Sequence, residues 1–253
     1  MKLVIQNTSH VWGGNEKSLA TLAHGLLARG HDVVISCARG VVSSRLKEMG
    51  IRTTHFRPRG SFDPVSGISF ALWLRRERPD ALLITSWNSL SWTSLSARAA
   101  GIRKTVLRQG IVRSAPASGL RRHAVHKWID DIITNAPEIR QRWLETAPGF
   151  PADRVHVVLN AVTPVAHRRG ELRASLRREL GLPDQVLLVG VAGIVARRKG
   201  FDIVLRAIAA NDDPHVQLAI IGDGPQRGEL ESLARDLAVS GRVHFLGRRE
   251  TAA

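Results

Sequence analysis

The sequence predicts an α/β protein with two doubly wound units, the second of them incomplete. Short apolar runs alternate with segments of helical periodicity along nearly the whole chain, which is typical of parallel sheets with right-handed crossovers. The alternation is interrupted once, near Thr163 and Pro164, where polar and basic residues take over. Only three further strands are expected after this interruption. We therefore expect a first domain at 1–163 and a second, partial domain at 164–253.

The first domain is expected to contain a complete sheet of about seven strands. It opens with a strand at 2–6, a polar loop that ends in Gly13 and Gly14, and a helix from Glu16 with Asn15 as its N-cap. The remaining strands are expected at 33–37, 51–56, 81–85, 105–107, 132–134 and 155–159. Helical patterns lie between them at 42–49, 65–78, 90–100, 120–129 and 138–146. Such a sheet binds its ligands beyond the carboxyl ends of the strands.

The second domain opens with an apolar run at 186–191, which a basic turn of Arg197, Arg198 and Lys199 follows. A helix is expected from Phe201, and two more strands at 216–221 and 242–246 with a helix between them. Lys199 comes just past a strand end and at the start of a helix, where free N–H groups and the helix dipole favour anions. The added cation predicts a phosphate or diphosphate site, and a solvated basic turn is the alternative.

The charge of the chain is large and uneven. The formal net charge is +15, and residues 1–165 hold +12 of it, with 23 Lys and Arg against 11 Asp and Glu. The first domain is therefore expected to meet any anionic partner: an acidic membrane surface, a phosphorylated acceptor or nucleic acid. An arginine-rich surface that serves solubility alone is the alternative. No nucleic-acid motif is present, so a specific nucleic-acid partner is not expected.

The single cysteine, Cys37, excludes an internal disulfide and fits a reducing compartment, and we expect its thiol to be buried. No secretory signal and no apolar run long enough to span a bilayer are expected. No Asp-x-Asp motif and no His/Cys cluster with metal spacing occurs. The sequence therefore favours a protein of the cytoplasm that needs no metal ion.

Two groups of residues are candidates for binding an acceptor. Trp87, Asn88 and Trp92 follow the strand at 81–85, where aromatic rings could stack on a sugar; helix packing is the alternative for the tryptophans. A basic stretch around Trp128 could rest on anionic lipid or hold a phosphate, and a solvated helix face is equally compatible with it. The basic stretch consists of Arg113, Arg121, Arg122, His123, His126 and Lys127.

Six motifs in this order resemble retaining glycosyltransferases of family 4, which have the GT-B fold of two Rossmann-like domains. The motifs are GGNE (13–16), ARGHDVVIS (28–36), LNAV (159–162), RKGFD (198–202), IIGDGP (220–225) and RVHFLG (242–247). The resemblance implies transfer of a hexose-type sugar from a UDP- or GDP-linked donor to a glycan or lipid-linked acceptor. It also implies a role in polysaccharide or lipopolysaccharide synthesis, without metal or other cofactor, in the cytoplasm or on the inner face of the membrane.

The resemblance also assigns residues. Lys199 matches the lysine that binds the donor diphosphate, and Arg197 or Arg198 is expected to replace the family's upstream arginine, where this chain has Ile194. Gly13 and Gly14 match the loop that approaches the phosphates and the acceptor. Gln109 stands where many members have a histidine near the reacting sugar, so it is the catalytic candidate, although an amide cannot act as a base.

Two departures and two alternatives complete the prediction. The family's second domain continues to a Glu-x7-Glu motif that binds the donor sugar, whereas this chain ends at Ala253. We therefore expect a fragment or a truncated gene product, which could be inactive. One alternative is an NADP-binding oxidoreductase, because Gly222, Gly224 and Gly228 follow a strand at nearly the spacing of the dinucleotide fingerprint. The other is a basic binding module without catalytic activity.

Overall fold

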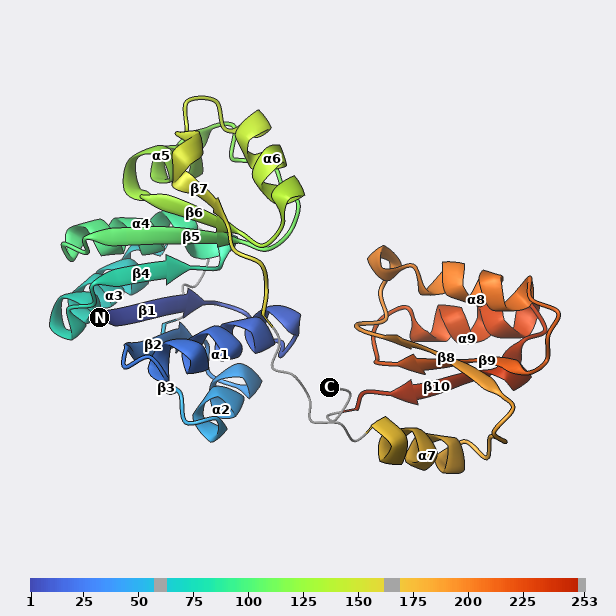
Figure 1. Ribbon diagram of the computed structural model, residues 1–253. Helices are drawn as coiled ribbons and strands as arrows, with labels where there is room; N and C mark the ends of the chain where they lie inside the picture. The colour runs from blue at the N-terminus through green and yellow to red at the C-terminus, as the bar shows by residue number, and fades with distance from the viewer. Residues whose placement is uncertain (57–62, 162–168, 250–253) are drawn as a thin grey trace. The chain divides into compact units, whose positions relative to one another are not determined.

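A computed structural model describes residues 1–56, 63–161 and 169–249. The chain divides into two compact units, Met1–Thr163 and Pro164–Ala253 (Figure 1). Each unit is an α/β structure built on a parallel sheet, as the sequence predicts. Three residues named above, Val162, Thr163 and Pro164, lie outside the described residues.

The first unit contains a seven-stranded parallel sheet in the order β3-β2-β1-β4-β5-β6-β7. Its strands are β1 (Lys2–Asn7), β2 (Asp32–Cys37), β3 (Arg52–His55), β4 (Ala81–Ile84), β5 (Lys104–Gln109), β6 (Asp131–Thr134) and β7 (Val155–Val157). The strand order reverses between β1 and β4, which pair in register from Leu3 with Ala81 to Gln6 with Ile84. This reversal is the topological switch point at which doubly wound sheets bind ligands.

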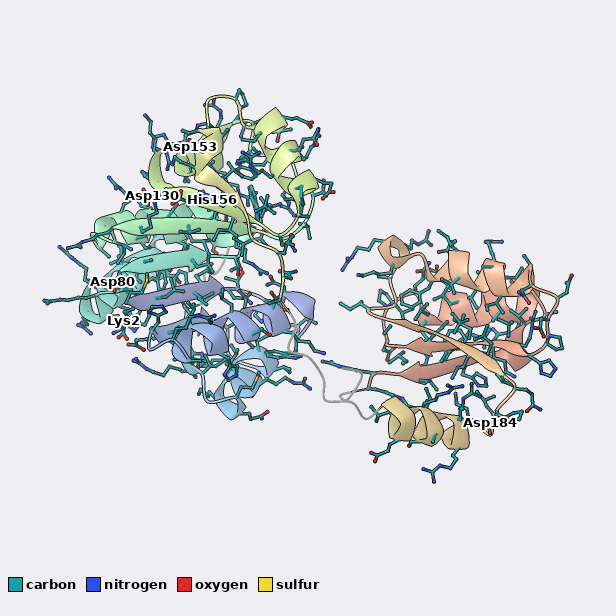
Figure 2. The ribbon with its side chains drawn as sticks, in the orientation of Figure 1. Lys2, Asp80, Asp130, Asp153, His156 and Asp184 are labelled. Carbon is teal, nitrogen blue, oxygen red and sulfur yellow. The ribbon has the colours of Figure 1, made fainter. Side chains whose placement is uncertain are left out.

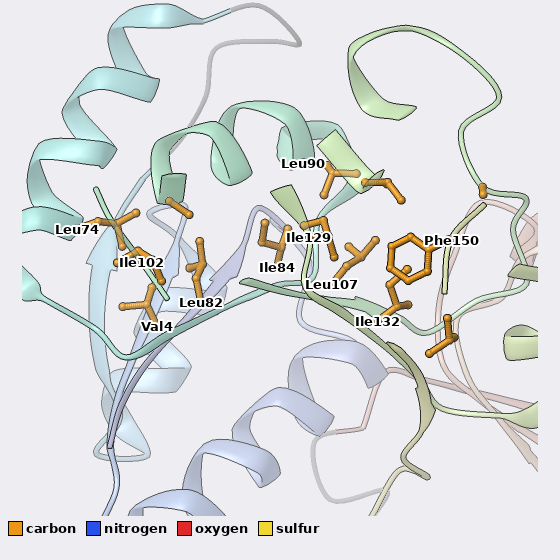
Figure 3. Close-up of a cluster of buried hydrophobic side chains, with 14 of the residues drawn as sticks. Val4, Leu74, Leu82, Ile84, Leu90, Ile102, Leu107, Ile129, Ile132 and Phe150 are labelled. Atoms are coloured by element: carbon orange, nitrogen blue, oxygen red, sulfur yellow. The ribbon is translucent and has the colours of Figure 1, made fainter. Parts of the chain in front are cut away.

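Helices cover both faces of this sheet. They are α1 (Gly14–Leu27), α2 (Val41–Glu48), α3 (Pro64–Glu77), α4 (Leu90–Ala99), α5 (Gly119–Trp128) and α6 (Pro137–Thr146), with short 3-10 turns at Trp87–Ser89 and Ala152–Arg154. One buried cluster joins α1 and α2 to the sheet, and a second joins α3 to α6 to the opposite face. The second cluster is shown in Figure 3, where Val4 and Leu82 from the centre of the sheet lie among the helix side chains.

Complete burial of β4 explains why this central strand is a continuous apolar run. All four residues of β4 are buried, and Ile84 and Leu107 are fully inaccessible. Each such side chain contributes about 1.5–3 kcal/mol through the hydrophobic effect. Both faces of the sheet are covered at β4, so this strand shows no polar alternation.

Carboxylates secure the amino ends of the strands. Asp80 accepts a hydrogen bond from the Lys2 N–H at 2.7 Å, and Asp130 accepts one from the Thr105 N–H at 2.7 Å (Figure 2). Asp131 forms an ion pair with Lys104 and a hydrogen-bond contact of 3.2 Å with His156 at the same edge. These acidic residues therefore stabilise the sheet at the edge opposite to the Gly13–Gly14 turn.

The start of α1 differs from the prediction. The helix begins at Gly14, and Gly13, not Asn15, is its N-cap, with extended backbone dihedrals of −136° and −164°. The reason is Glu16, which occupies the third helical position and accepts the Gly13 N–H in a capping box. Asn15 therefore lies inside the first turn. The last strand, β7, also ends two residues earlier than expected.

The second unit contains a three-stranded parallel sheet in the order β10-β9-β8 among the described residues. Its elements are α7 (Arg169–Glu179), β8 (Leu187–Ala192), α8 (Phe201–Ala209), β9 (Val216–Ile221), α9 (Arg227–Asp236) and β10 (Val243–Gly247), with 3-10 turns at Arg197–Lys199 and Ser240–Arg242. Phe201, Leu205 and Ile208 of α8 pack with Leu218 and Ile220 of β9 in the core.

Helix α7 was not predicted, because its sequence has no apolar stripe. Its one buried side chain between Gly170 and Glu179 is Arg177, whose guanidinium donates to the Pro183 carbonyl at 2.9 Å and to the Val186 carbonyl at 2.6 Å. A polar side chain thus ties this helix to the start of β8. Hydrophobic periodicity, which identifies most helices, gives no signal in such a case.

Candidate functional site

Polar side chains join β1 and β4 at the carboxyl edge of the first sheet. The Thr85 hydroxyl donates to the Gln6 carbonyl at 2.9 Å, and the Gln6 amide donates to the Ser89 hydroxyl at 2.9 Å. The Thr8 N–H donates to the Ser86 hydroxyl at 2.7 Å. These bonds fix the start of the loop that leads from β1 to the Gly13–Gly14 turn, at the switch point of the sheet.

Glu16 fixes the other end of this loop. Its carboxylate is buried and accepts hydrogen bonds from the Gly13 N–H at 3.0 Å and from the side-chain amides of Asn7 and Asn15, each at 3.1 Å. Burial raises the pKa of Glu16, but these hydrogen bonds outweigh it, and the pKa lies below its usual value. Glu16 is therefore an ionised residue that holds the turn in shape.

Gly14 leaves open space in front of the turn. A Cβ atom placed on Gly14 would meet no atom within 4 Å, and one placed on Gly13 would only reach the Glu16 carboxylate at 3.4 Å. Neither glycine has a positive φ. The backbone conformation therefore does not require glycine here, and close approach of a ligand to the first N–H groups of α1 stays a prediction.

Arg108, at the end of β5, contacts three neutral oxygens near this turn. Its guanidinium donates to the side-chain oxygen of Asn15 at 2.9 Å, to the hydroxyl of Ser18 at 2.8 Å and to the side-chain oxygen of Asn160 at 2.8 Å. Burial lowers the pKa of Arg108, and the nearby charge of Glu16 partly opposes that shift. Arg108 thus links α1 to the segment that follows β7.

Gln109 is placed differently from a residue that meets substrate. Its side chain is 1% exposed, its oxygen accepts the indole N–H of Trp87, and its amide donates to the Ile111 carbonyl at 2.6 Å. Both polar atoms of the amide are engaged within the protein. In this structure Gln109 positions Trp87 and the chain after β5, and its catalytic role stays a prediction.

Trp87 and Asn88 follow β4 at the carboxyl edge. Trp87 is half-buried, with the ring of Trp143 at 5.7 Å and the guanidinium of Arg113 at 5.3 Å from its centroid. Asn88 is exposed. Trp92 lies against Gly67 of α3, so helix packing accounts for it. Contact of Trp87 or Asn88 with an acceptor stays a prediction.

The basic turn of the second unit follows β8. Arg197–Lys199 form a 3-10 turn, and Gly200, with φ of 67°, leads into α8. Arg198 and Lys199 are exposed, and within the described residues neither side chain forms an ion pair. Arg197 instead pairs with Glu229 of α9 at 3.2 Å, and both line a groove of about 300 Å³. Arg198 and Lys199 are therefore the cations available to a ligand at the start of α8.

Two glycines after β9, Gly222 and Gly224, pack against the backbone of the segment that follows β8. A Cβ atom on Gly222 would lie 1.8 Å from the Gly193 carbonyl oxygen, and one on Gly224 would lie 2.4 Å from that of Val195. The same loop is hydrogen-bonded to the segment after β8, because the Val195 N–H donates to the Asp223 carbonyl at 3.1 Å. Packing within the second unit therefore accounts for these two glycines, and Arg249 after β10 pairs with Glu179.

Within residues 1–56, 63–161 and 169–249, no group of three or more His, Cys, Asp or Glu side chains could hold a metal ion. Over the same ranges, no helix is both long and apolar enough to cross a bilayer.

Two units with parallel sheets, each carrying a glycine or basic turn at a carboxyl edge, define a fold of the GT-B type. The model of glycosyltransferase family 4 matches residues 12–165, and the model of glycosyl transferases group 1 matches residues 173–253. The chain belongs to glycosyltransferase family 4. The resemblance inferred from the sequence motifs is thereby confirmed.

Named relatives support the same family. The lipopolysaccharide core biosynthesis glycosyltransferase LpsE of Rhizobium meliloti is 28% identical over 237 residues, which cover 93% of this chain and 64% of LpsE. A D-inositol 3-phosphate glycosyltransferase of Mycobacterium avium is 31% identical over 180 residues, 69% of this chain and 39% of the relative. The chain therefore spans less than two thirds of the length of these relatives.

A solved structure shares the fold. The crystal structure of Anabaena Alr3699/HepE in complex with UDP-glucose superposes with a TM-score of 0.80 at 20% identity, covering 98% of this chain and 69% of HepE. At this identity the likeness concerns the fold.

Sequence reasoning missed two residues of the first unit's edge. The sequence places Glu16 at the start of a helix and in the GGNE motif but does not assign it a capping role, although an acidic residue three positions after a glycine N-cap is a recognisable capping signal. Arg108 gave no signal, since its partners Asn15, Ser18 and Asn160 lie 93, 90 and 52 residues away along the chain.

Proposed function

We propose that this chain binds a nucleoside diphosphate sugar, linked to UDP or GDP, and takes part in transferring the sugar to a glycan or lipid-linked acceptor. In the reaction the bond from the sugar's anomeric carbon to the diphosphate breaks, and a bond to an acceptor hydroxyl oxygen forms. The products are the glycoside, the nucleoside diphosphate and the proton of that hydroxyl. Retention of configuration is proposed from family membership.

The basic turn of the second unit is the observation that carries this proposal. Arg198 and Lys199 are exposed and unpaired within the described residues, and they lie between the carboxyl end of β8 and the first turn of α8. The leaving diphosphate gains negative charge as the glycosidic bond breaks, and fixed cations and helix N–H groups at that point stabilise it. Two side-chain cations can perform this role without a metal ion, so we propose a metal-independent reaction.

The first unit is proposed to contribute the acceptor side. The open space at Gly14 supports close approach of a phosphate or sugar group to the start of α1. Trp87 and Asn88 are proposed to contact the acceptor at the end of β4, with Gln109 holding the Trp87 indole in place. Gln109 is thus proposed to affect the reaction indirectly, by holding the Trp87 indole.

Titration of the protein with UDP-glucose, GDP-mannose and free UDP by calorimetry tests donor binding. The Lys199→Ala variant is expected to bind the nucleotide sugar about 10- to 100-fold more weakly, because it loses a charge-assisted contact to phosphate. Arg235→Ala is the matched control, since Arg235 is a cation of the same unit on α9 and its guanidinium donates to the Ser232 hydroxyl. Equal affinities for Lys199→Ala and the parent protein would overturn the proposed donor site.

We also propose that the first unit contacts an anionic membrane surface on the cytoplasmic side. Ile111 and Val112 are 57% and 66% exposed, and Leu120 at the start of α5 is 50% exposed. Arg122 and Lys127 are exposed on α5 itself. Exposed apolar side chains beside cations suit an interface with anionic lipid.

Sedimentation with vesicles of phosphatidylcholine, with and without phosphatidylserine, tests this contact. Binding to the anionic vesicles is expected to fall several-fold in Val112→Glu and in 0.5 M salt. Val65→Glu is the control, because Val65 is 73% exposed but lies on α3. Equal sedimentation with both kinds of vesicle would exclude an electrostatic membrane contact.

A further inference from the structure

Four side chains form a continuous series of hydrogen bonds within the first unit. The Asn160 oxygen accepts from Arg108 at 2.8 Å, and Arg108 donates to the Asn15 oxygen at 2.9 Å. The Asn15 amide donates to Glu16 at 3.1 Å, and Glu16 accepts the Gly13 N–H at 3.0 Å. We refer to Asn160, Arg108, Asn15 and Glu16 as the relay. It begins in the chain segment after β7 and ends at the glycine turn.

Arg108 is the centre of the relay, and its chemistry suits that position. All three acceptors of its guanidinium are neutral, and among the described residues no carboxylate lies within ion-pair distance of it. The guanidinium is a partly buried charge, and a buried N–H donor that loses its acceptor destabilises the folded state. Each of the three acceptors therefore matters to Arg108. The planar, multivalent guanidinium also fixes the directions of its partners, which a lysine ammonium does not do. Displacement of Asn160 therefore changes the position of Arg108.

Arg108 is linked to the Gly13–Gly14 turn through Asn15 and Glu16. Asn15 is the only member of the relay that contacts both Arg108 and Glu16, so it passes a change from one to the other. Glu16 holds the Gly13 N–H, and Asn7 holds Glu16 from the end of β1. The glycine turn is thus set by one fixed contact from the sheet and one contact that depends on Asn160.

We propose that Arg108 is a positioning residue that makes the Gly13–Gly14 turn responsive to the segment containing Asn160. This segment is the last described part of the first unit before the chain continues into the second. The consequence for catalysis rests on the proposed function, because the turn is where a phosphate or acceptor group is proposed to approach. The conformational coupling itself is independent of it.

Amide hydrogen exchange of the protein without ligand, measured by NMR, tests the coupling. Asn160→Ala and Arg108→Lys are each expected to raise the exchange rate of the Gly13 N–H about fivefold, which corresponds to the loss of one hydrogen bond. Exchange in the centre of the sheet, for example at Leu83, is expected to stay unchanged, which distinguishes the relay from general loss of stability. Gln141→Ala on α6 is the control, because the Gln141 amide donates to Glu145 of the same helix.

Interruption of the relay gives the sharper result. In an Asn15→Ala background the relay is already broken between Arg108 and Glu16, so Asn160→Ala is expected to add no further acceleration at Gly13. Unchanged Gly13 exchange in Asn160→Ala, or an equal acceleration in both backgrounds, would overturn the relay. Failure of the parent protein to bind any nucleotide sugar would overturn the proposed function and leave the exchange result standing.

Discussion

Gly222→Ala is expected to destabilise the second unit severely. A Cβ atom at Gly222 would lie 1.8 Å from the Gly193 carbonyl oxygen and 2.9 Å from its carbon, and Gly222 has φ of 138°, where residues with a side chain are strained. The clash is with backbone, and the Gly193 N–H is held by the Ile221 carbonyl at 2.9 Å, so the strands must move apart. Overpacking at about 1–3 kcal/mol and dihedral strain at about 1–3 kcal/mol give a loss of about 2–6 kcal/mol.

The distribution of tryptophan gives this prediction a sharp assay. All six tryptophans lie in the first unit, so their fluorescence reports on that unit alone, whereas far-UV circular dichroism reports on both. In urea, Gly222→Ala is expected to show an early transition by circular dichroism and an unchanged midpoint by fluorescence. A circular dichroism curve identical to that of the parent protein would refute the packing argument.

Gly14→Ala is the matched comparison in the other glycine turn. Because its Cβ enters open space and the residue has no positive φ, we expect a change in unfolding free energy within about 0.5 kcal/mol. Gly14 and Gly222 thus separate a glycine that leaves room from a glycine that is packed. A large loss of stability in Gly14→Ala would show that the space beside α1 is needed by the fold itself.

Three further predictions concern buried groups. Glu16→Gln should lower the unfolding free energy by about 1–3 kcal/mol at pH 7. Hydrogen bonds outweigh burial and lower the folded pKa of Glu16. The difference in unfolding free energy between the parent and the variant is therefore present above the unfolded pKa of about 4.3 and is lost as pH falls through the folded pKa. A difference that grows on acidification would contradict this prediction. Gln109→Leu should cost about 1–3 kcal/mol and shift the near-UV spectrum, because the Trp87 N–H loses its acceptor; an unaltered spectrum would argue against this bond. Cys37 is fully buried, and burial raises the pKa of its thiol to about 11, so a thiol reagent at pH 8 should modify it in urea but not in the native protein.

The strands could be predicted because the pattern that identifies them, a run of apolar residues, is contained in a few consecutive positions. β4 is apolar throughout, and β1 and β2 each contain three consecutive apolar residues, because both faces of the sheet are covered there. The burial of Cys37 at the end of β2 follows from the same pattern. Helix α7 escaped this reasoning because its stabilising contact is a guanidinium on two carbonyl groups.

The sequence by itself determined the parallel α/β architecture, the family and the positions of Gly14 and Lys199 after strand ends, because these depend on short-range periodicity and on motifs along the chain. The tertiary structure alone decided how the polar side chains are used. It engaged Gln109 with Trp87, paired Arg197 with Glu229, and brought Arg108 to Asn160. The physical reason is that a polar side chain takes its role from its hydrogen-bond partner, and the order of the strands in the sheet determines which distant residue that partner is.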